Sequence, residues 1–233
     1  MLESVAFVTA NYKREQVLKL YCEGIERLRR QSHIRIESVI VGDENNVTKD
    51  YNCYHIPYNN DMLTRKFNVA AQRARTLDVD GIIISGSDDL YNDNLFNYIT
   101  SQEEEFVHYR DVYFFSLDGD TKGELRYLTS SSVGCGRLLR RSLLDRVDWK
   151  ICNLERLWGV DQVVWRTILR HIESQQLFLA RDIDGKCVDL KSAESMNLFT
   201  KWKGLPKADV SELYSWLSPQ ELDILNQILN KQL

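Results

Sequence analysis

Two adjacent carboxylates, Asp88 and Asp89, follow an apolar run that begins at Gly81. Because neighbouring carboxylates repel each other, a compensating positive charge is expected beside them. Magnesium and manganese prefer oxygen ligands, and such a cation could also hold the phosphate oxygens of a ligand. The pair therefore indicates a divalent metal site. The alternative is an acidic turn in solvent, in which one of the two aspartates caps a helix that begins near Tyr91.

The run over residues 81–86 predicts a buried central strand, because it contains three consecutive isoleucines and is bounded by glycine. In open α/β sheets, ligands bind at the carboxyl end of such strands, which is where the two aspartates follow. Two earlier strands end in the same way, the first at Thr9 and Asn11 and the second at Asp43. Since the carboxyl ends of parallel strands share one edge of a sheet, these side chains are expected to form the rim of one site.

The first ninety residues alternate strand and helix, a pattern that makes a parallel sheet with helices on its faces. We predict an α/β fold with a mainly parallel central sheet flanked by helices over residues 1–200, and a C-terminal helical extension over residues 201–233 that packs on it. The predicted strands are residues 5–9, 34–41, 54–57, 81–86, 112–117, 125–128, 177–180 and 187–190. The predicted helices are residues 15–30, 60–75, 93–106, 138–144, 158–171, 210–217 and one that starts in a capping box at 218–221, with a linker over 201–208.

The composition favours a globular protein with one sizeable core and argues against several other classes of protein. The chain has 233 residues, of which 43% are hydrophobic, so it can bury one sizeable core. Its net charge of −4 argues against nucleic-acid binding through bulk charge. Its five cysteines are scattered without a C-x-x-C motif, and no apolar run approaches the roughly 20 residues that span a bilayer. We expect a soluble protein without a membrane span, in the cytoplasm of a bacterium or of a virus-infected host cell.

Several short motifs resemble those of GT-A-fold glycosyltransferases of the large family two type, which are mostly inverting and use nucleotide sugars. The resemblance covers residues 5–180, and its donor-side motifs are TANYKR at 9–14, VGDE at 41–44, LTRKFNVA at 63–70 and SDD at 87–89. It implies that Asp89 binds a divalent cation, Mn²⁺ or Mg²⁺, that Asp43 contacts the nucleotide base and that Asp88 lies near the ribose. The residues it implies for binding a nucleotide sugar, most simply a UDP-sugar, are Thr9, Asn11, Tyr12, Arg14, Asp43, Arg65, Asn68 and Asp88.

The acceptor side of the resemblance rests on GCG at 134–136 and WGVD at 158–161. It implies that Asp161 is the catalytic base. A carboxylate in the first turn of a helix could also be a cap that the helix dipole favours, and that alternative stays open. The implied acceptor-side residues are Gly134, Gly136, Trp158 and Gly159.

The sequence departs from the family pattern at two points. Val160 stands where the family often has glutamate. No histidine follows His171, although many relatives have a late histidine as a metal ligand. Water, Asp184 or Asp189 could take the place of that ligand.

The resemblance implies transfer of a sugar to an acceptor hydroxyl with inversion, in which Arg65 or Lys66 assists the leaving phosphate. The acceptor hydroxyl has a high pKa and needs a positioned base, which would be Asp161. We expect a saccharide or another soluble hydroxyl-bearing molecule as acceptor. Nucleotidyltransferases and dinucleotide-dependent dehydrogenases are disfavoured, because no glycine-rich loop follows the first strand.

Two alternatives remain. One is a viral type of DNA glycosyltransferase acting on hydroxymethylated bases, because a cluster of arginines could meet DNA phosphates. The other is a non-catalytic module that binds nucleotide sugars. The arginines of that cluster are Arg137, Arg140, Arg141 and Arg146.

Overall fold

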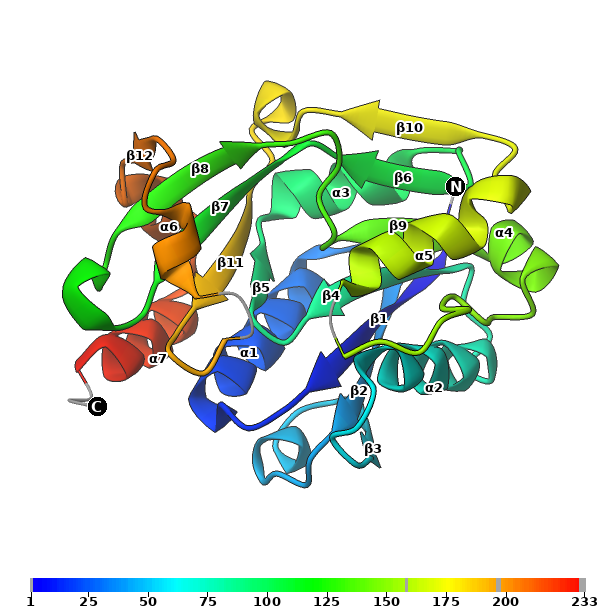
Figure 1. Cartoon of the computed structure of the whole chain (residues 1–233), viewed down its shortest axis with the longest axis horizontal. Helices are drawn as coiled ribbons and strands as arrows, with labels where there is room; N and C mark the ends of the chain where they lie inside the picture. The colour runs from blue at the N-terminus through cyan, green and yellow to red at the C-terminus, as the bar shows by residue number, and fades with distance from the viewer. Residues whose placement is uncertain (1, 158, 196–197, 231–233) are drawn as a thin grey trace.

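The computed structural model describes residues 2–157, 159–195 and 198–230, and it contains two β-sheets with helices around them (Figure 1). The larger sheet has seven strands in the order β10-β6-β9-β4-β1-β2-β3. Strands β4, β1, β2 and β3 are parallel neighbours, whereas β9 runs antiparallel to both β4 and β6. The strands are β1 (Ser4–Asn11), β2 (Arg35–Gly42), β3 (Tyr54–Pro57), β4 (Gly81–Gly86), β6 (Phe106–Tyr109), β9 (Arg137–Arg140) and β10 (Gln175–Phe178).

Helices cover both faces of the larger sheet because its strands are apolar on both faces. In β1, Val5 and Phe7 pack with Leu18 of α1, and the alternating residues Ala6 and Val8 join the hydrophobic cluster on the opposite face. Burying a side chain such as Val5, Phe7, Val8 or Leu18 contributes roughly 1.5–3 kcal/mol. One face carries α1 (Glu15–Gln31) and α3 (Asp93–Ser101); the other carries α2 (Leu63–Arg75), α4 (Arg141–Arg146) and α5 (Val160–Ile168).

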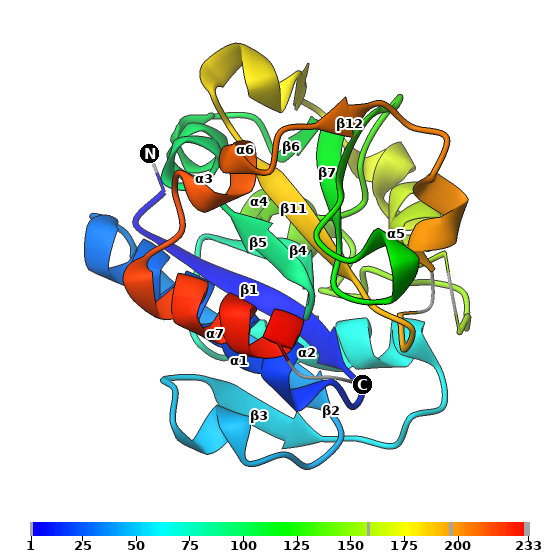
Figure 2. The same cartoon turned by 90° about the vertical axis from the view of Figure 1, so that its left-hand side faces the viewer.

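The smaller sheet has five strands in the order β12-β8-β7-β11-β5. The chain enters it directly from β4, through a turn at Ser87 and Asp88, so the acidic motif lies where the two sheets meet. Helices α6 (Ser211–Tyr214) and α7 (Pro219–Asn230) pack with this sheet and with α1, as Figure 2 shows. The strands are β5 (Asp89–Tyr91), β7 (Asp111–Ser116), β8 (Leu125–Thr129), β11 (Cys187–Lys191) and β12 (Lys207–Ala208). Short 3₁₀ helices lie at Val47–Lys49, Gly119–Thr121, Leu169–His171, Ala180–Ile183 and Phe199–Trp202.

The α/β class and the parallel strands of the first ninety residues are confirmed, and β3 has the predicted bounds. The predicted helical start at 138–144 is wrong, because Leu138 and Leu139 lie in β9 and α4 begins only at Arg141. A short apolar run fits either element, and here β9 pairs with strands on both sides. The predicted helix over 93–106 ends at Ser101, where the side chains of Thr100 and Gln102 bond to carbonyls of α3.

The C-terminal part contributes to the body of the fold. Within the predicted linker over 201–208, β12 pairs with β8 of the smaller sheet. The division of the chain at residue 200 therefore stays a prediction. None of the described helices combines the length and apolar character needed to cross a bilayer.

A capping box fixes α7, as the sequence predicts. The backbone N–H of Ser218 donates to Glu221 Oε2 at 2.8 Å, and the N–H of Glu221 donates to Ser218 Oγ at 3.2 Å. The same Glu221 oxygen accepts from Arg27 Nε of α1 at 2.9 Å, and both side chains are buried. One carboxylate thus starts α7 and ties it to α1.

Replacing Glu221 with Ala should lower the free energy of unfolding by about 3 kcal/mol, because it removes one member of a buried ion pair together with a helix cap. The measurement is urea unfolding of the whole chain. The matched control is Gln220→Ala, at the neighbouring exposed position of α7, which should change the value by less than about 0.5 kcal/mol. Equal effects of the two variants would contradict a structural role for the Glu221–Arg27 pair.

Candidate active site

Three carboxylates meet at the junction of the two sheets. Asp88 and Asp89 follow β4, and the antiparallel pairing of β5 with β11 places Asp189 opposite Asp89. One carboxylate oxygen from each of the three lies within 4.8 Å of the others. A Cβ at Gly86 would come within 2.5 Å of Asp88 Oδ1, so the glycine before the motif is needed for this close approach. The strand pairing thus assembles an oxygen-rich cluster from distant parts of the sequence.

The cluster is only partly neutralised. Arg14 donates to Asp88 at 2.9 Å, and Lys191 pairs with Asp189 at 2.5 Å. Asp89 accepts from the backbone N–H of Gly86 at 2.5 Å and from Tyr91 Oη at 3.3 Å, but no described residue forms an ion pair with it. Asp189 Oδ1 is buried and has no hydrogen-bond partner in the described part of the chain. Three acidic groups therefore face two cations.

The pKa values follow from this charge balance. Burial, and then the charges of Asp189 and Asp88, raise the pKa of Asp89 well above its ordinary value. Burial also raises the pKa of Asp189, to about 6, although Lys191 opposes the shift. For Asp88 burial acts in the same direction, but the charges of Arg14 and Lys191 outweigh it and leave its pKa lowered. A further positive charge beside Asp89 and Asp189 would relieve the repulsion.

These residues fit a hard divalent cation. Asp89 and Asp189 offer buried carboxylate oxygens, one of them unpartnered, and carboxylates suit magnesium and manganese. Asp184, the other acid considered for this role, is exposed and pairs with Lys186 instead. The thiols of Cys135 and Cys187 lie 3.4 Å apart within reach of Asp89, which makes a second donor set suited to a softer ion.

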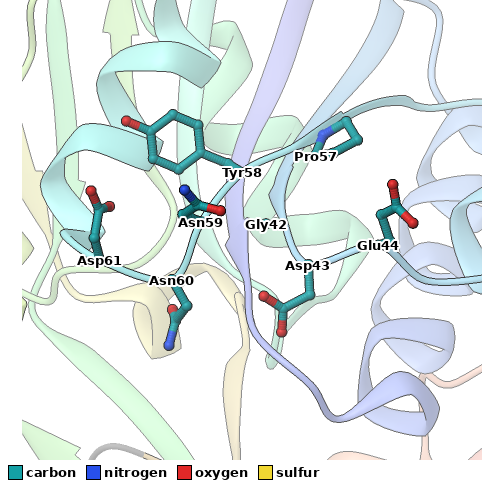
Figure 3. Close-up of a pocket in the computed structure, with 8 residues that line it drawn as sticks. All are labelled: Gly42, Asp43, Glu44, Pro57, Tyr58, Asn59, Asn60 and Asp61. Atoms are coloured by element: carbon teal, nitrogen blue, oxygen red, sulfur yellow. The ribbon is translucent and has the colours of Figure 1, made fainter.

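Two adjoining pockets lead to the cluster from the carboxyl edge of the larger sheet. The first, of about 610 Å³, lies between the loop after β2 and the segment before α2, and Figure 3 shows Asp43 on the first side with Asn60 and Asp61 on the second. Asn60 and Asp61 also line the next pocket, of about 350 Å³, which reaches Asp88. The two pockets therefore form one path toward the carboxylates.

The second pocket has a basic wall. It is lined by Tyr12, Arg14 and Lys66 among others. The buried Lys66 donates from Nζ to the carbonyl of Asn11 at 3.0 Å and to Asn60 Oδ1 at 2.9 Å. Its ammonium also lies over the ring of Tyr12, 5.8 Å from the centroid. This wall could bind anionic oxygens next to the acidic cluster.

Asp161 connects two further pockets. One, of about 380 Å³, contains the acidic cluster, and the other, of about 530 Å³, lies on the far side of Asp161. A Cβ at Gly134 would come within 2.7 Å of Asp161 Cβ, so Gly134 lets α5 approach closely. Helix α5 begins after Gly159, which adopts a φ of 69° and provides no side-chain cap. Within the described residues the Asp161 carboxylate makes no hydrogen bond or ion pair, so it is not acting as a cap.

Several residues suggested by the sequence lie away from these pockets. The Thr9 hydroxyl is buried 2.6 Å from Tyr21 Oη, and Arg65 pairs with Asp61 and Glu155 at the surface. Asn68 holds the backbone of Cys152 with two hydrogen bonds. Gly136, with a φ of 68°, packs against Tyr109 in the core. Trp158 lies outside the described residues.

Three residues that line the pockets had weak or no signals in the sequence. Lys66 was one of two basic residues at neighbouring helix positions, and only their different directions on α2 separate them. Asp189 was one of two acidic residues, with Asp184, that could replace the missing histidine as a metal ligand. Lys191 gave no signal of its own, although its spacing of two residues from Asp189 places both on one face of a strand.

Comparisons with known proteins show the fold. No protein-family model matches the sequence, and no curated protein matches it either. A mutant of Drosophila β1,4-galactosyltransferase 7, in complex with manganese, UDP-Gal and xylobiose, is similar with a TM-score of 0.51 and 17% identity; the alignment covers 78% of this chain and 66% of that chain. A glycosyltransferase involved in glycosylating the major capsid of PBCV-1 is similar with a TM-score of 0.51 and 9% identity, over 80% of this chain and 93% of the other.

The inositol-1-phosphate CTP transferase of T. maritima is also similar, with a TM-score of 0.50 and 7% identity, over 100% of this chain and 98% of the other. At these identities the likeness concerns the fold alone. The chain has the α/β fold of nucleotide-diphospho-sugar transferases, known as GT-A-like.

Replacing Asp89 with Asn should stabilise the metal-free protein by about 1 kcal/mol, or roughly 2–4 °C in Tm, because it removes the carboxylate that lacks a cation. It should also abolish the stabilisation that added manganese gives to the wild type. Both are measured by thermal unfolding with and without manganese. The control is Asp184→Asn, a position with a φ of 51° that Asn tolerates, and its manganese response should match the wild type. A normal manganese response in Asp89→Asn would place the cation elsewhere.

Proposed function

We propose that this chain is a metal-dependent glycosyltransferase that moves a sugar from a nucleotide-diphosphate sugar to an acceptor hydroxyl, with Asp161 as general base. One observation carries the proposal: Asp161 lines both the pocket of the acidic cluster and the pocket beyond it. A base that takes a proton from an attacking hydroxyl must stand between donor and acceptor. Its carboxylate has no described partner and is free for that role.

The donor fits the path from the first pocket to the acidic cluster. In this arrangement Asp43 hydrogen-bonds the nucleotide base, Tyr12 and Asp88 flank the ribose, and the wall of Arg14 and Lys66 faces the diphosphate. Arg14 holds Asp88 in place by their 2.9 Å contact. A nucleotide-diphosphate sugar places a base, a ribose and two phosphates along this path in that order, and the donor of this kind that we propose is a UDP-sugar, which the sequence resemblance most simply implies.

The metal would be held by Asp89 and Asp189, and manganese or magnesium suits their oxygens. Such a cation supplies positive charge that stabilises the diphosphate as it leaves. Lys191 lines the pockets on both sides of the cluster, so its ammonium would be available to the same phosphate oxygens. Its bond to Asp189 keeps it there before the donor binds.

The transfer step proceeds in one displacement. The acceptor oxygen forms a bond to the anomeric carbon while the bond from that carbon to the diphosphate breaks, and Asp161 receives the hydroxyl proton. Attack from the face opposite the leaving group inverts the anomeric centre. This reaction corresponds to the family two type of GT-A-fold enzyme that the sequence resembles.

The contacts made by the arginine cluster that was considered for DNA binding favour a saccharide acceptor over DNA. Arg141 bonds to Asp78 and to the carbonyl of Val79, and Arg146 pairs with Glu105. Arg140 donates to the carbonyls of Gln102 and Glu104. These three side chains secure neighbouring segments of the fold, so they do not form a free basic surface.

Thermal unfolding with a panel of nucleoside diphosphates, with and without manganese, tests the donor site. We expect stabilisation by UDP that manganese strengthens. No stabilisation by any nucleotide would contradict the proposed function and favour a different ligand for the fold.

Replacing Asp161 with Asn should leave UDP-dependent stabilisation unchanged and reduce sugar transfer by about 10²–10⁴-fold, since the amide cannot accept the hydroxyl proton. The measurement is product formation from a UDP-sugar, next to the unfolding temperature with UDP and manganese. The matched control is Asp182→Asn, an exposed residue outside the pockets, which should transfer at the wild-type rate. Transfer by Asp161→Asn at the wild-type rate would show that the base is another group.

A further inference from the structure

The pocket on the far side of Asp161 has a wall of hydrogen-bond donors. It has a volume of about 530 Å³, and the residues that matter for its chemistry are His108, Ser131, Ser132, Arg137 and Trp165. Arg137 comes from β9, His108 from β6 and Trp165 from α5, so the larger sheet and its covering helix build it together. The proposed mechanism assigns no role to the polar side chains of this wall.

Arg137 is a buried cation that forms no ion pair with any described residue; burial lowers its pKa, and the charge of Asp161, which lines the same pocket, opposes that shift. Only 4% of the residue is exposed. Its Nε donates to the carbonyl of Val133 at 2.7 Å, Nη1 to the carbonyl of Asp161 at 2.8 Å and Nη2 to Ser132 Oγ at 3.2 Å. All three acceptors are neutral, and no carboxylate of the described residues forms an ion pair with it. A guanidinium has five N–H groups, so two remain. Because a buried charge is costly unless paired, this side chain is suited to an anionic ligand.

His108 adds a second donor through a chain of hydrogen bonds. The residue is 3% exposed, and its ring lies tilted against the rings of Phe106 and Trp165, with centroid distances of 4.4 Å and 5.8 Å. Burial, and then the charge of Arg137, lower the pKa of His108 to about 4, so the ring is neutral at pH 7. Nδ1 lies 2.8 Å from Ser132 Oγ, and that oxygen already accepts from Arg137. The Ser132 proton can point at Nδ1 or at the carbonyl of Val133, which lies 3.5 Å away, and the shorter distance favours Nδ1.

This arrangement puts the ring proton of His108 on Nε2. Nε2 is buried and makes no well-formed hydrogen bond within the described residues, and the side chain of Gln175, which also lines the pocket, is the nearby group that raises the pKa of the ring against the effect of burial. An N–H donor and a guanidinium with two unused N–H groups thus line one pocket. An oxygen anion would satisfy both.

We propose that this pocket is the acceptor subsite and that it selects a saccharide carrying one anionic group, a phosphate or a carboxylate, which accepts hydrogen bonds from Arg137 and His108. The proposal rests on the proposed function, since Asp161 must face the acceptor hydroxyl. Trp165 and Leu177 supply apolar surface for a sugar ring. A single buried guanidinium matches a single anionic group, whereas a nucleic-acid backbone needs a series of cations.

Paired variants at Ser131 test the charge preference without touching Arg137. Ser131 is exposed at the rim of the pocket, so substitutions there should not disturb folding. Ser131→Asp adds a negative charge, and Ser131→Asn is its neutral match in shape. The probes are glucose, glucuronate and glucose 6-phosphate, added to the full chain saturated with UDP and manganese, with affinity measured by calorimetry.

In the wild type we expect the two charged sugars to bind at least ~10-fold more tightly than glucose, as a charge-assisted hydrogen bond implies. Ser131→Asp should weaken their binding by about 10-fold relative to Ser131→Asn and leave glucose unchanged. Arg137→Gln, which keeps hydrogen-bond donors but loses the charge, should remove the preference for charged sugars. The difference between glucuronate and glucose 6-phosphate identifies which anion the pocket takes.

Equal affinity for the three sugars, or failure of all three to bind, overturns the anionic subsite. Equal effects of the Asp and Asn variants at Ser131 overturn it as well, as does tighter binding of a hydroxymethylated DNA oligonucleotide than of any charged sugar. Each of these outcomes counts against the anionic subsite only if the wild type binds UDP and manganese. If the wild type binds neither, the proposed function itself is contradicted, so the two failures are distinguishable.

Discussion

The repulsion among three buried carboxylates at the junction of the two sheets is the constraint around which the site is built. The turn that carries the chain from β4 into β5 places Asp88 and Asp89 against β11, where Asp189 is opposite Asp89. Arg14 pairs with Asp88 and Lys191 pairs with Asp189, whereas Asp89 forms no ion pair with the described residues. Arg14 reaches Asp88 from a left-handed backbone conformation with a φ of 54°, a strained geometry of the kind that persists where surrounding contacts hold it.

The same junction explains why the pockets form a line. The carboxyl edge of the larger sheet provides the first two pockets, and the smaller sheet closes the site from the other side with β7 and β11. Asp161 of α5 lines two of these pockets. Its helix can approach Gly134 closely because this residue has no side chain. A donor in the first pockets and an acceptor in the last would therefore meet at one carboxylate.

Periodicity predicts the part of the fold whose contacts are mostly between neighbours in sequence. The alternating strands and helices up to β4 follow from apolar spacing, and the polar residues at their ends predict one shared edge. Three strands of the smaller sheet were predicted, but their assembly into a second sheet was not, because three of its pairings join segments far apart in the chain. The site shows the same limit: Asp88 and Asp89 stand out in sequence, whereas Asp189 and Lys191 gain meaning only from the register of β5 with β11. Arg65 and Lys66 are adjacent on α2, and their opposite surroundings could not be separated without the packing of that helix.

Arg137 joins the two halves of the proposed reaction. Its Nη1 holds the backbone carbonyl of Asp161, while its remaining N–H groups lie in the pocket that we assign to the acceptor. An anion that binds the guanidinium would draw on the same side chain that positions the first turn of α5. In the proposed reaction one rigid planar group would therefore contact both the anion of the acceptor and the backbone that carries the base. Arg14 and Lys191 line pockets on the other side of Asp161, so the carboxylate that we propose as the base lies between two regions that carry cationic side chains.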